Sequence, residues 1–261
     1  MMPKSKLSID HIVHYVENLD IAVKDFQKNG FNVLRGGIHT GGLTQNAMIH
    51  FLDGTFIELI SFTNSIQSTF FKWMFRLHLS SFIHNSPRMT VAKRVVSRMA
   101  LCPQGMIDFA VKSRSFQDDY TRITHEGVQL SAPADMTRKL PDLDLSWQMS
   151  IPDFHELPFL ISDYNVIPVL SQDAAIHENG AAGISKILVF TNKLKKTSEY
   201  YQAFLGIDAE IVNNESRKAV VFNSTPSIIE IVSPKNPKMD SSGYGIFALE
   251  FKFPDQPTEA N

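Results

Sequence analysis

The sequence is poor in cysteine, because Cys102 is the only one among its 261 residues. A single cysteine excludes an internal disulfide, and we interpret the chain as a cytoplasmic protein from a reducing compartment. Long apolar runs are also missing. No stretch approaches the roughly 18 apolar residues that a membrane span needs, and the first ten residues lack the apolar core of a signal peptide. We therefore predict no membrane association.

An excess of charge of one sign is absent as well. The formal net charge is -2 and the isoelectric point is about 6.5. Such a chain has no basic field to attract nucleic acid. The sequence also lacks a Ser-His-Asp order, a cysteine-nucleophile signature, zinc-finger spacing and a nucleotide-binding fingerprint. These absences argue against nucleic-acid binding, hydrolase, thiol-redox and kinase functions.

What the sequence does contain is a pattern that occurs three times. The first copy, residues 7–64, has a strand-like run, a helix-like run that ends at Gly30, and three further strand-like runs. A weaker copy spans residues 104–168. A third copy, with one additional strand-like run, spans residues 169–261. The pattern predicts an α+β fold of repeated βαβββ units with curved, mainly antiparallel sheets, and a domain boundary near residue 168.

The segment 65–103 between the first two copies matches neither and predicts a helical insertion. Phe70, Trp73, Met74 and Leu77 recur there at helical spacing. We interpret this stripe as the face of a helix that packs on the core or on a second copy in a homodimer. A mobile lid is one alternative. A helix on a membrane surface is another, although cationic residues are few for that role.

Several short motifs stand in a fixed order in the first unit: an Asp-His pair that includes His11, a helix end in GF, GG-x-H with His39, T-x-N-A with Thr44 and Asn46, and DGT-F-x-E-L with Glu58. In these motifs the chain resembles the glyoxalase-like domain family of the vicinal-oxygen-chelate superfamily, which also includes bleomycin-resistance proteins and extradiol dioxygenases. The resemblance covers about residues 7–165. It implies paired βαβββ units around a small-molecule cavity.

His11 and Glu58 are the candidate catalytic residues. On alternating strands, His11 shares a face with Ile9 and Val13, and Glu58 shares a face with apolar neighbours. A carboxylate on an apolar face needs a cation, hydrogen bonds or a proton. The resemblance implies that His11 and Glu58 form half of a site for a divalent ion (Zn, Ni, Fe, Mn or Mg), which polarises the substrate while a carboxylate moves a proton.

The other half of this metal site is incomplete. Alignment of the second unit on the first places Met106 opposite His11, and Leu160 or an apolar neighbour opposite Glu58. Neither is a ligand for a hard metal ion. The metal hypothesis therefore needs a further ligand, for which the candidates are His39, His50 and Asp108. The alternative is a metal-free buried pair in which His11 hydrogen-bonds Glu58.

The third unit offers an internal comparison. Its first and fourth strands place Lys186 and Glu230 where the first unit has His11 and Glu58. We predict that Lys186 and Glu230 lie within ion-pair distance, so that the third unit is structural.

Six polar or aromatic residues are predicted to contact a ligand. The glycine-rich segment before and after His39 allows close approach of the backbone to a ligand, and His50 shares a strand face with Asn46. An arginine suits a carboxylated substrate. A strand tryptophan is a candidate platform or core residue. The predicted ligand-binding residues are His39, Thr44, Asn46, His50, Arg138 and Trp147.

Two functions remain open from the sequence. The first is a glyoxalase-like protein that binds a small oxygenated molecule and acts on it as a metal-dependent lyase or isomerase. The second is a non-catalytic, metal-free protein of the same superfamily that sequesters a small molecule in an aromatic cavity. The apolar residues aligned with His11 and Glu58 favour the second.

Overall fold

The structure is a computed structural model that describes residues 7–39, 41–77, 87–140, 143–166, 172–213, 218–233 and 244–254. The first predicted unit is present in the predicted order. Asn18 begins its helix, because the side-chain oxygen accepts a hydrogen bond from the backbone N–H of Ile21 at 3.1 Å. The elements are β1 (Ser8–Tyr15), α1 (Leu19–Lys28), β2 (Leu34–Ile38), β3 (Thr44–His50) and β4 (Phe56–Phe62).

The second unit has the same plan, with one strand that the sequence reading missed. That strand is β6, because Arg138 interrupts the alternation of apolar residues that identifies a strand. The elements of the unit are β5 (Gly105–Ser113), α4 (Phe116–His125), β6 (Ala134–Leu140), β7 (Leu143–Ser150) and β8 (Phe159–Ser162).

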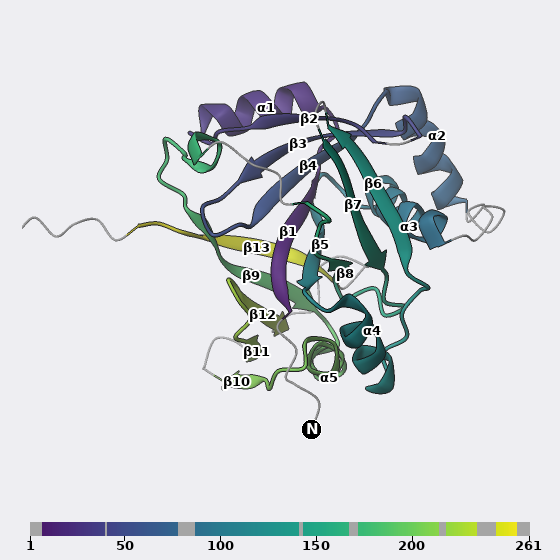
Figure 1. The fold of residues 1–261 in the computed structure, drawn as a ribbon, viewed down its shortest axis with the longest axis vertical. Helices are drawn as coiled ribbons and strands as arrows, with labels where there is room; N and C mark the ends of the chain where they lie inside the picture. The colour runs from purple at the N-terminus through teal and green to yellow at the C-terminus, as the bar shows by residue number, and fades with distance from the viewer. Residues whose placement is uncertain are drawn as a thin grey trace, which may run out of the picture.

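The two units form one curved eight-stranded sheet in the order β2-β3-β4-β1-β5-β8-β7-β6 (Figure 1). The antiparallel pair β1–β5 joins them, while β1–β4 and β5–β8 are the parallel pairs inside each unit. We call the side of this sheet that bears Val13, Glu58 and Phe159 the cavity face. The opposite side, which bears Ile12 and Leu160, is the back face. The predicted α+β fold of repeated βαβββ units is confirmed.

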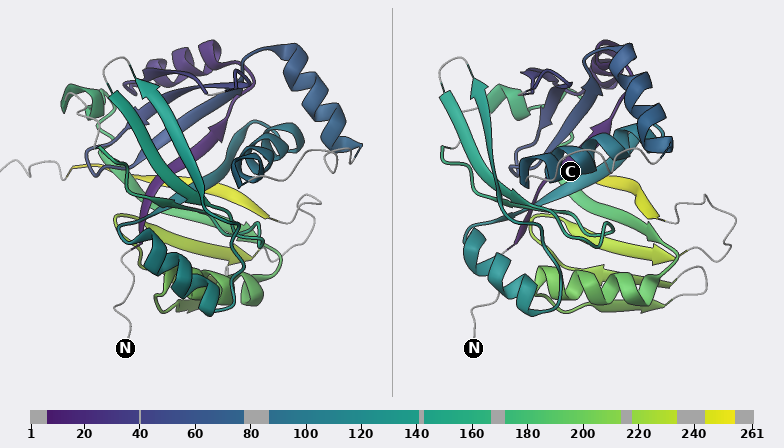
Figure 2. Two further views of the ribbon diagram at one scale, coloured as in Figure 1. Left: turned by 45° about the vertical axis from the view of Figure 1, so that its right-hand side comes forward. Right: turned by 90° about the vertical axis from the view of Figure 1, so that its right-hand side faces the viewer.

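The third unit forms a separate five-stranded sheet in the order β10-β11-β12-β9-β13. It packs beside the back face, and α4 and α5 lie side by side (Figure 2). A short 3-10 helix, η2 (Gln172–Ala175), precedes it. Its elements are β9 (Gly183–Thr191), α5 (Leu194–Leu205), β10 (Glu210–Asn213), β11 (Lys218–Phe222), β12 (Ile228–Ser233) and β13 (Tyr244–Lys252).

The internal comparison between the units is confirmed by one ion pair. Lys186 Nζ lies 3.2 Å from Glu230 Oε2, and 3.2 Å from Glu250 Oε1 on β13. Glu230 is buried, so the cation neutralises a carboxylate that burial would otherwise destabilise. β13 pairs with β9 antiparallel, in the position that β5 takes beside β1.

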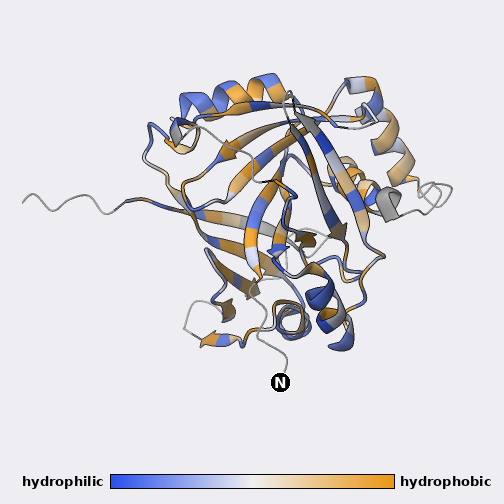
Figure 3. Cartoon of the chain, viewed as in Figure 1, coloured by the Kyte–Doolittle hydropathy of each residue, from blue (hydrophilic) through white to orange (hydrophobic). Residues whose placement is uncertain are grey.

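Two hydrophobic clusters divide the core. One fills the space between the back face and the third unit, and includes Ile12, Phe109 and Ile187. The other lies on the cavity face under the helical insertion. In Figure 3 the apolar colour runs along the central strands, whereas α4 is mostly hydrophilic. Among the described residues, no helix is long and apolar enough to cross a bilayer.

The predicted insertion contains α2 (Ser65–Arg76) and α3 (Pro87–Leu101), and residues 78–86 of it lie outside the described residues. Only one residue of the predicted apolar stripe packs on the core, and the packing of the stripe on a second copy stays a prediction. Met74 and Phe75 are buried, but Phe70, Trp73 and Leu77 are exposed. Besides Met74, the side chains that anchor α2 lie outside the predicted stripe: Phe75 is buried, and Phe71 stacks on Phe62 with 6.0 Å between ring centres.

The alignment of Met106 with His11 is also wrong. Both Met106 and Leu160 pack in the cluster on the back face. The helices of the two units begin at Leu19 and Phe116, so equivalent residues of the two units are 97 positions apart. Asp108 is therefore the residue of the second unit that corresponds to His11. Phe159 pairs with Ala110 as Glu58 pairs with Val13, so Phe159 takes the place of Glu58. The residue that corresponds to His11 therefore lies two positions further along β5 than the motif alignment placed it.

Asp108 anchors the insertion to the second unit. Its carboxylate is bound by Arg94 of α3, with Nε at 2.8 Å and Nη2 at 3.0 Å, and Arg98 Nη1 lies 3.1 Å away. Arg94 also stacks over the Phe159 ring at 4.6 Å from its centre. Asp108 and Arg94 are both buried, so each charge depends on the other.

We predict that Arg94→Met lowers the free energy of unfolding by about 3 to 5 kcal/mol, because it leaves the Asp108 carboxylate with one cation in a buried site. Urea unfolding at neutral pH measures this change. Lys195→Met, at a side chain that is 92% exposed, is the control and should change the value by less than about 0.5 kcal/mol. Equal effects from the two variants would contradict the prediction.

Candidate functional site

A cavity of about 1060 Å³ lies on the cavity face of the eight-stranded sheet. Helix α3 closes one side of it with apolar side chains, and Thr225 and Pro226 of the third unit contribute to the wall near β1. Seven of the eight residues that the sequence analysis selected line this cavity: His11, His39, Thr44, His50, Glu58, Arg138 and Trp147. The eighth, Asn46, hydrogen-bonds two of them.

The parallel pairing of β1 with β4 brings His11 and Glu58 to neighbouring positions. His11 is paired with Phe56, and Val13 with Glu58, so the shared faces predicted for the two strands meet in the cavity. The imidazole of His11 stacks on the Phe56 ring with 4.6 Å between centres. The ring contact fixes the plane of the imidazole.

A polar cluster around His11 includes three residues that the sequence analysis did not select. His11 Nδ1 lies 2.8 Å from Asp10 Oδ2, and the hydroxyl of Tyr164 donates to the same oxygen at 3.2 Å. Lys112 Nζ lies 3.0 Å from Asp10 Oδ1. Neighbours on a strand normally point to opposite faces, but the bulge at Asp10 brings its carboxylate to the His11 ring. The Asp-His motif was the available signal.

This cluster has a defined protonation pattern. Burial alone would raise the pKa of Asp10, but the hydrogen bond and charge of His11, and the charge of Lys112, lower it below the usual value. An ionised Asp10 accepts hydrogen bonds only, so His11 Nδ1 is the donor, and Nε2 is the ring nitrogen left to face a ligand. Burial, and next the Asp10 charge, raise the pKa of Tyr164 well above 10, so it stays a hydroxyl donor.

A second cluster surrounds Glu58. Its Oε1 accepts hydrogen bonds from Asn46 Nδ2 at 2.5 Å and from Arg138 Nη2 at 3.2 Å, and His39 Nε2 lies 3.4 Å from it. His39 Nδ1 contacts Thr44 Oγ1 at 2.8 Å. The predicted hydrogen bond between His11 and Glu58 is therefore wrong, because His11 is bound to Asp10 and Glu58 to these other groups.

The glycine pair before His39 is explained by its contact with the Asn46 side chain. Asn46 Oδ1 accepts a hydrogen bond from the backbone N–H of Gly37 at 3.2 Å. A Cβ on Gly36 would lie 2.0 Å from the same oxygen. Only glycine at residue 36 leaves room for the Asn46 side chain, whose amide contacts both β2 and Glu58. The GG-x-H motif therefore positions Asn46, which donates a hydrogen bond to the Glu58 carboxylate.

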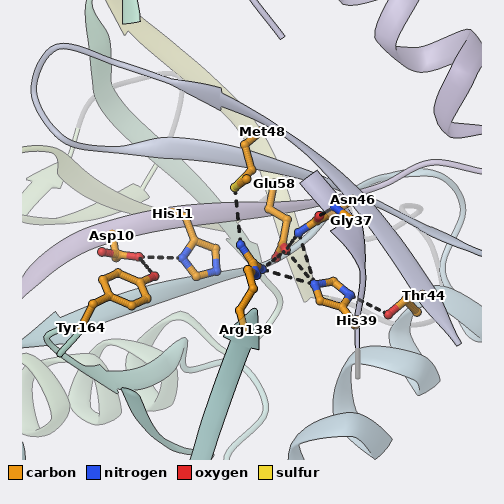
Figure 4. Close-up of polar contacts among 10 residues, drawn as sticks. All are labelled: Asp10, His11, Gly37, His39, Thr44, Asn46, Met48, Glu58, Arg138 and Tyr164. Atoms are coloured by element: carbon orange, nitrogen blue, oxygen red, sulfur yellow. Dashed lines mark hydrogen bonds and ion pairs between the residues drawn. The ribbon is translucent and has the colours of Figure 1, made fainter. Parts of the chain in front are cut away.

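Glu58 is ionised in this cluster. Burial would raise its pKa, but the hydrogen bond and charge of His39, followed by the charges of Arg138 and His11, lower it far below its usual range. Arg138 comes from β6, and its Nη1 also contacts Met48 Sδ at 3.5 Å. Its guanidinium lies 5.9 Å from the centre of a Trp147 ring. Figure 4 draws this guanidinium between the His11 ring and the Glu58 carboxylate.

The residues present do not fit a divalent ion. His11 and Glu58 supply two ligands, and the described residues contain no group of three or more His, Cys, Asp or Glu side chains arranged to hold a metal. Two candidates for a third ligand are already bound to other groups. His39 contacts Asn46 and Thr44, and Asp108 is held by Arg94. Arg138 on Glu58 would repel a second cation.

His50, the remaining candidate ligand, lines the cavity as an uncharged side chain. Its ring lies 5.1 Å from Phe56, and its buried Nε2 has no hydrogen-bond partner in the described structure. Burial, and next the charge of Arg138, lower its pKa from 6.5 to about 4. His50 is thus a neutral polar atom available to a ligand.

Comparison with known proteins identifies the family. The model of the glyoxalase-like domain matches residues 9–205, three quarters of the chain. The chain belongs to the glyoxalase-like domain family. No curated protein matches the sequence. The matched segment extends through α5, beyond residue 168, and the position of the domain boundary stays a prediction.

Solved structures share the fold of this glyoxalase-like protein. A hypothetical protein from Staphylococcus aureus has 17% identity and a TM-score of 0.61, over 88% of this chain and 86% of that one. A mutant 4-hydroxymandelate synthase from Streptomyces coelicolor has 12% identity and a TM-score of 0.58, over 96% and 71%. A fusion of a xylose isomerase-like TIM barrel with a 4-hydroxyphenylpyruvate dioxygenase has 13% identity and a TM-score of 0.54, over 95% and 37%.

The His50 environment generates a pH prediction. Because its folded pKa lies below its unfolded value, the stability contributed by neutral His50 is present above pH 6.5 and is lost as the pH falls from 6.5 towards 4. We expect its ring protons to titrate in NMR spectra with a midpoint near 4. Arg138→Met should raise this midpoint, since it removes a nearby cation, and burial should still keep it below 6.5.

Lys28→Met on the exposed end of α1 serves as the control and should leave the midpoint unchanged. A midpoint near 6.5 in the unmodified protein would show that the His50 ring is accessible to water, and would contradict the prediction.

Proposed function

We propose that this glyoxalase-like protein binds a small oxygenated molecule without a metal ion, and that Arg138 receives the acidic oxygens of that molecule. The observation that carries the proposal is the contact of Arg138 with Glu58. It supports a site in which a guanidinium, rather than a divalent cation, compensates the buried carboxylate at the centre of the cavity.

The size and polarity of the cavity wall indicate what kind of ligand the site can bind. The volume of about 1060 Å³ exceeds what a three-carbon metabolite fills, and suits a molecule of drug-like size. Most of the wall is apolar, and polar groups gather in the Glu58 and His11 clusters. This division favours an elongated, largely apolar molecule with a carboxylate or neighbouring oxygens at one end. The apolar wall includes Leu43, Val95, Val96, Met136, Leu145 and Phe159.

Arg138 has hydrogen-bonding capacity for such a ligand. One of its contacts is with the Met48 sulfur, a weak acceptor that a ligand oxygen would replace with gain. A guanidinium binds a carboxylate through two parallel hydrogen bonds, and Trp147 holds its plane from one side. The unpartnered Nε2 of His50 adds a further polar contact.

The first test uses metal-free protein. We expect chelator-treated protein to bind long-chain 2-oxo acids in a thermal-shift and calorimetry panel as well as untreated protein does. Arg138→Met should weaken binding of these acids about tenfold or more, because it removes a charge-assisted pair, and should leave binding of the corresponding primary amides within about twofold.

The matched control is Arg114→Met, another arginine of the cavity wall, which lies outside the Glu58 cluster. The proposal fails if treated protein loses binding that added metal restores, or if both arginine variants weaken acids and amides equally.

A second candidate function, catalysis, is favoured by the contact between Asp10 and His11. Asp10 holds the imidazole with Nδ1 as donor, so Nε2 is free to take a proton from a ligand. The proton next to a 2-oxo group is acidic enough for such a base. Removal of the proton leaves an enolate, whose oxygen Arg138 can stabilise. The return of a proton to the same carbon completes an exchange without any other reactant.

This activity is tested by proton exchange in D₂O. We expect the unmodified protein to exchange the carbon-bound protons next to the 2-oxo group of a bound acid, followed by NMR. His11→Gln should slow the exchange about 100-fold or more while the acid still binds, because the base is lost. His14→Gln, on the back face beside Phe26, is the control. Exchange that is unchanged in His11→Gln would leave binding alone as the function.

A further inference from the structure

The helical insertion presents an exposed apolar stripe that the cavity does not use. Four side chains on α2 and its last cap are spaced four, three and four residues apart, so they lie along one line of the helix. Their exposed fractions are 81% for Ile66, 54% for Phe70, 57% for Trp73 and 50% for Leu77. Isolated exposed apolar residues are common, but a continuous stripe with two aromatic rings marks an interaction surface.

The place of α2 in the fold leaves this stripe accessible. The helix lies at the edge of the molecule and packs against α3 and the end of β4 (Figures 1 and 2). It packs through Met74 and Phe75, which are buried, and the stripe follows the adjacent side. The N-terminal cap of Asn64, which accepts from the N–H of Gln67 at 2.9 Å, helps to hold the helix in this orientation.

The charged residues of the insertion itself have one sign. Residues 59–107 contain no aspartate or glutamate, although the chain as a whole has more acidic than basic residues. The same segment has six basic residues, of which Arg94 and Arg98 hold Asp108, and Lys72 lies 3.1 Å from Glu17. Arg76 remains exposed at the end of α2, and Lys93 of α3 is half-buried.

Arg76 and Lys93 both line an open groove between α2 and α3. The groove has a volume of about 570 Å³, and its other walls include Phe75 and the exposed Leu101. Two cations above apolar walls match a molecule with an anionic head and an apolar body. The groove therefore combines basic charge with apolar surface, as the outer side of α2 does, and could hold a single lipid molecule.

We propose that the α2–α3 insertion docks the protein on the surface of an anionic lipid bilayer. The stripe of Ile66, Phe70, Trp73 and Leu77 enters the boundary between head groups and acyl chains, and Arg76 and Lys93 contact lipid phosphates. Aromatic residues favour this boundary, where one side of the ring is apolar and the other is wet. The association is peripheral and rests on a helix that lies in the surface, so this proposal replaces the sequence-based prediction of no membrane association.

A second copy of the chain fits these observations less well. Two insertions that face each other would bring basic surfaces together without acidic partners, which costs free energy at short range. A stable interface also involves about 20 to 30 residues on each side, whereas the stripe has four. An anionic bilayer complements the charge and needs only a shallow contact.

The test uses the full chain and the fluorescence of Trp73. The sequence has two tryptophans, so Trp147→Phe leaves Trp73 as the single reporter. We expect vesicles with about a third of phosphatidylglycerol in phosphatidylcholine to shift its emission to shorter wavelength and to sediment with the protein. Vesicles of phosphatidylcholine alone should bind about tenfold less, and 0.5 M salt should weaken binding to the anionic vesicles.

Two variants separate the apolar contact from the charge. Phe70→Ser with Leu77→Ser should abolish vesicle binding, and Arg76→Glu with Lys93→Glu should weaken it about tenfold or more. All four side chains lie outside the ligand cavity, so binding of 2-oxo acids should not change. Matched controls are Ile21→Ser with Ile211→Ser, at apolar residues 59% and 74% exposed, and Lys24→Glu with Lys28→Glu on α1.

Three results would overturn the proposal. The first is equal binding to anionic and uncharged vesicles. The second is loss of vesicle binding in the control variants to the same extent. The third is a solution dimer that Phe70→Ser with Leu77→Ser dissociates, without vesicle binding by the unmodified protein; this would assign the stripe to a second copy of the chain.

Discussion

The structure depends on the compensation of buried carboxylates by cations from distant parts of the chain. Glu58 on β4 meets Arg138 of β6, Asp108 on β5 meets Arg94 of α3, and Asp10 on β1 meets Lys112 of β5. A carboxylate in such positions is unstable unless a cation or hydrogen-bond donors surround it. Each of these contacts therefore ties one unit or insertion to another, and together they order the walls of the cavity.

The same contacts decide what chemistry the site can perform. Where the family resemblance implies a metal ion beside His11 and Glu58, the second unit contributes an arginine to the Glu58 carboxylate and an aspartate that α3 neutralises. Arginine binds an anion through fixed, directional hydrogen bonds, whereas a metal ion binds neighbouring oxygens and withdraws electrons from them. The function that we propose therefore rests on Arg138 as the receptor of an acid and on His11 as a base, rather than on a Lewis acid.

The helical insertion has two roles in this arrangement. Its α3 closes the cavity with valine side chains and holds Asp108, so the insertion is part of the domain rather than an appendage. Its α2 faces outward with apolar and basic residues. The two roles are compatible, because an amphipathic ligand and a bilayer surface call for the same pairing of apolar area with localised charge.

Much of the fold could be predicted from the sequence, since local signals define a βαβββ unit: alternating apolar residues, a helix that ends at Gly30, and glycines where strands turn. Polar residues on apolar strand faces, together with the motifs of the family, also selected seven residues that line the cavity, but they missed Asp10, Lys112 and Tyr164. The strand β6 was missed, since Arg138, the feature that gives it a function, disrupts the alternation that would have identified it.

The partners of these residues were decided by the tertiary structure. A bulge of one residue turns Asp10 towards His11, and Asp108, which corresponds to His11 in the second unit, is held by Arg94 of α3. Neither feature can be recognised from the spacing of apolar and polar residues in the sequence. The sequence by itself determined the repeated unit and the residues that face its cavity, because these depend on periods of a few residues. Only the tertiary structure decided which charge meets which, because those contacts join residues that lie far apart along the chain.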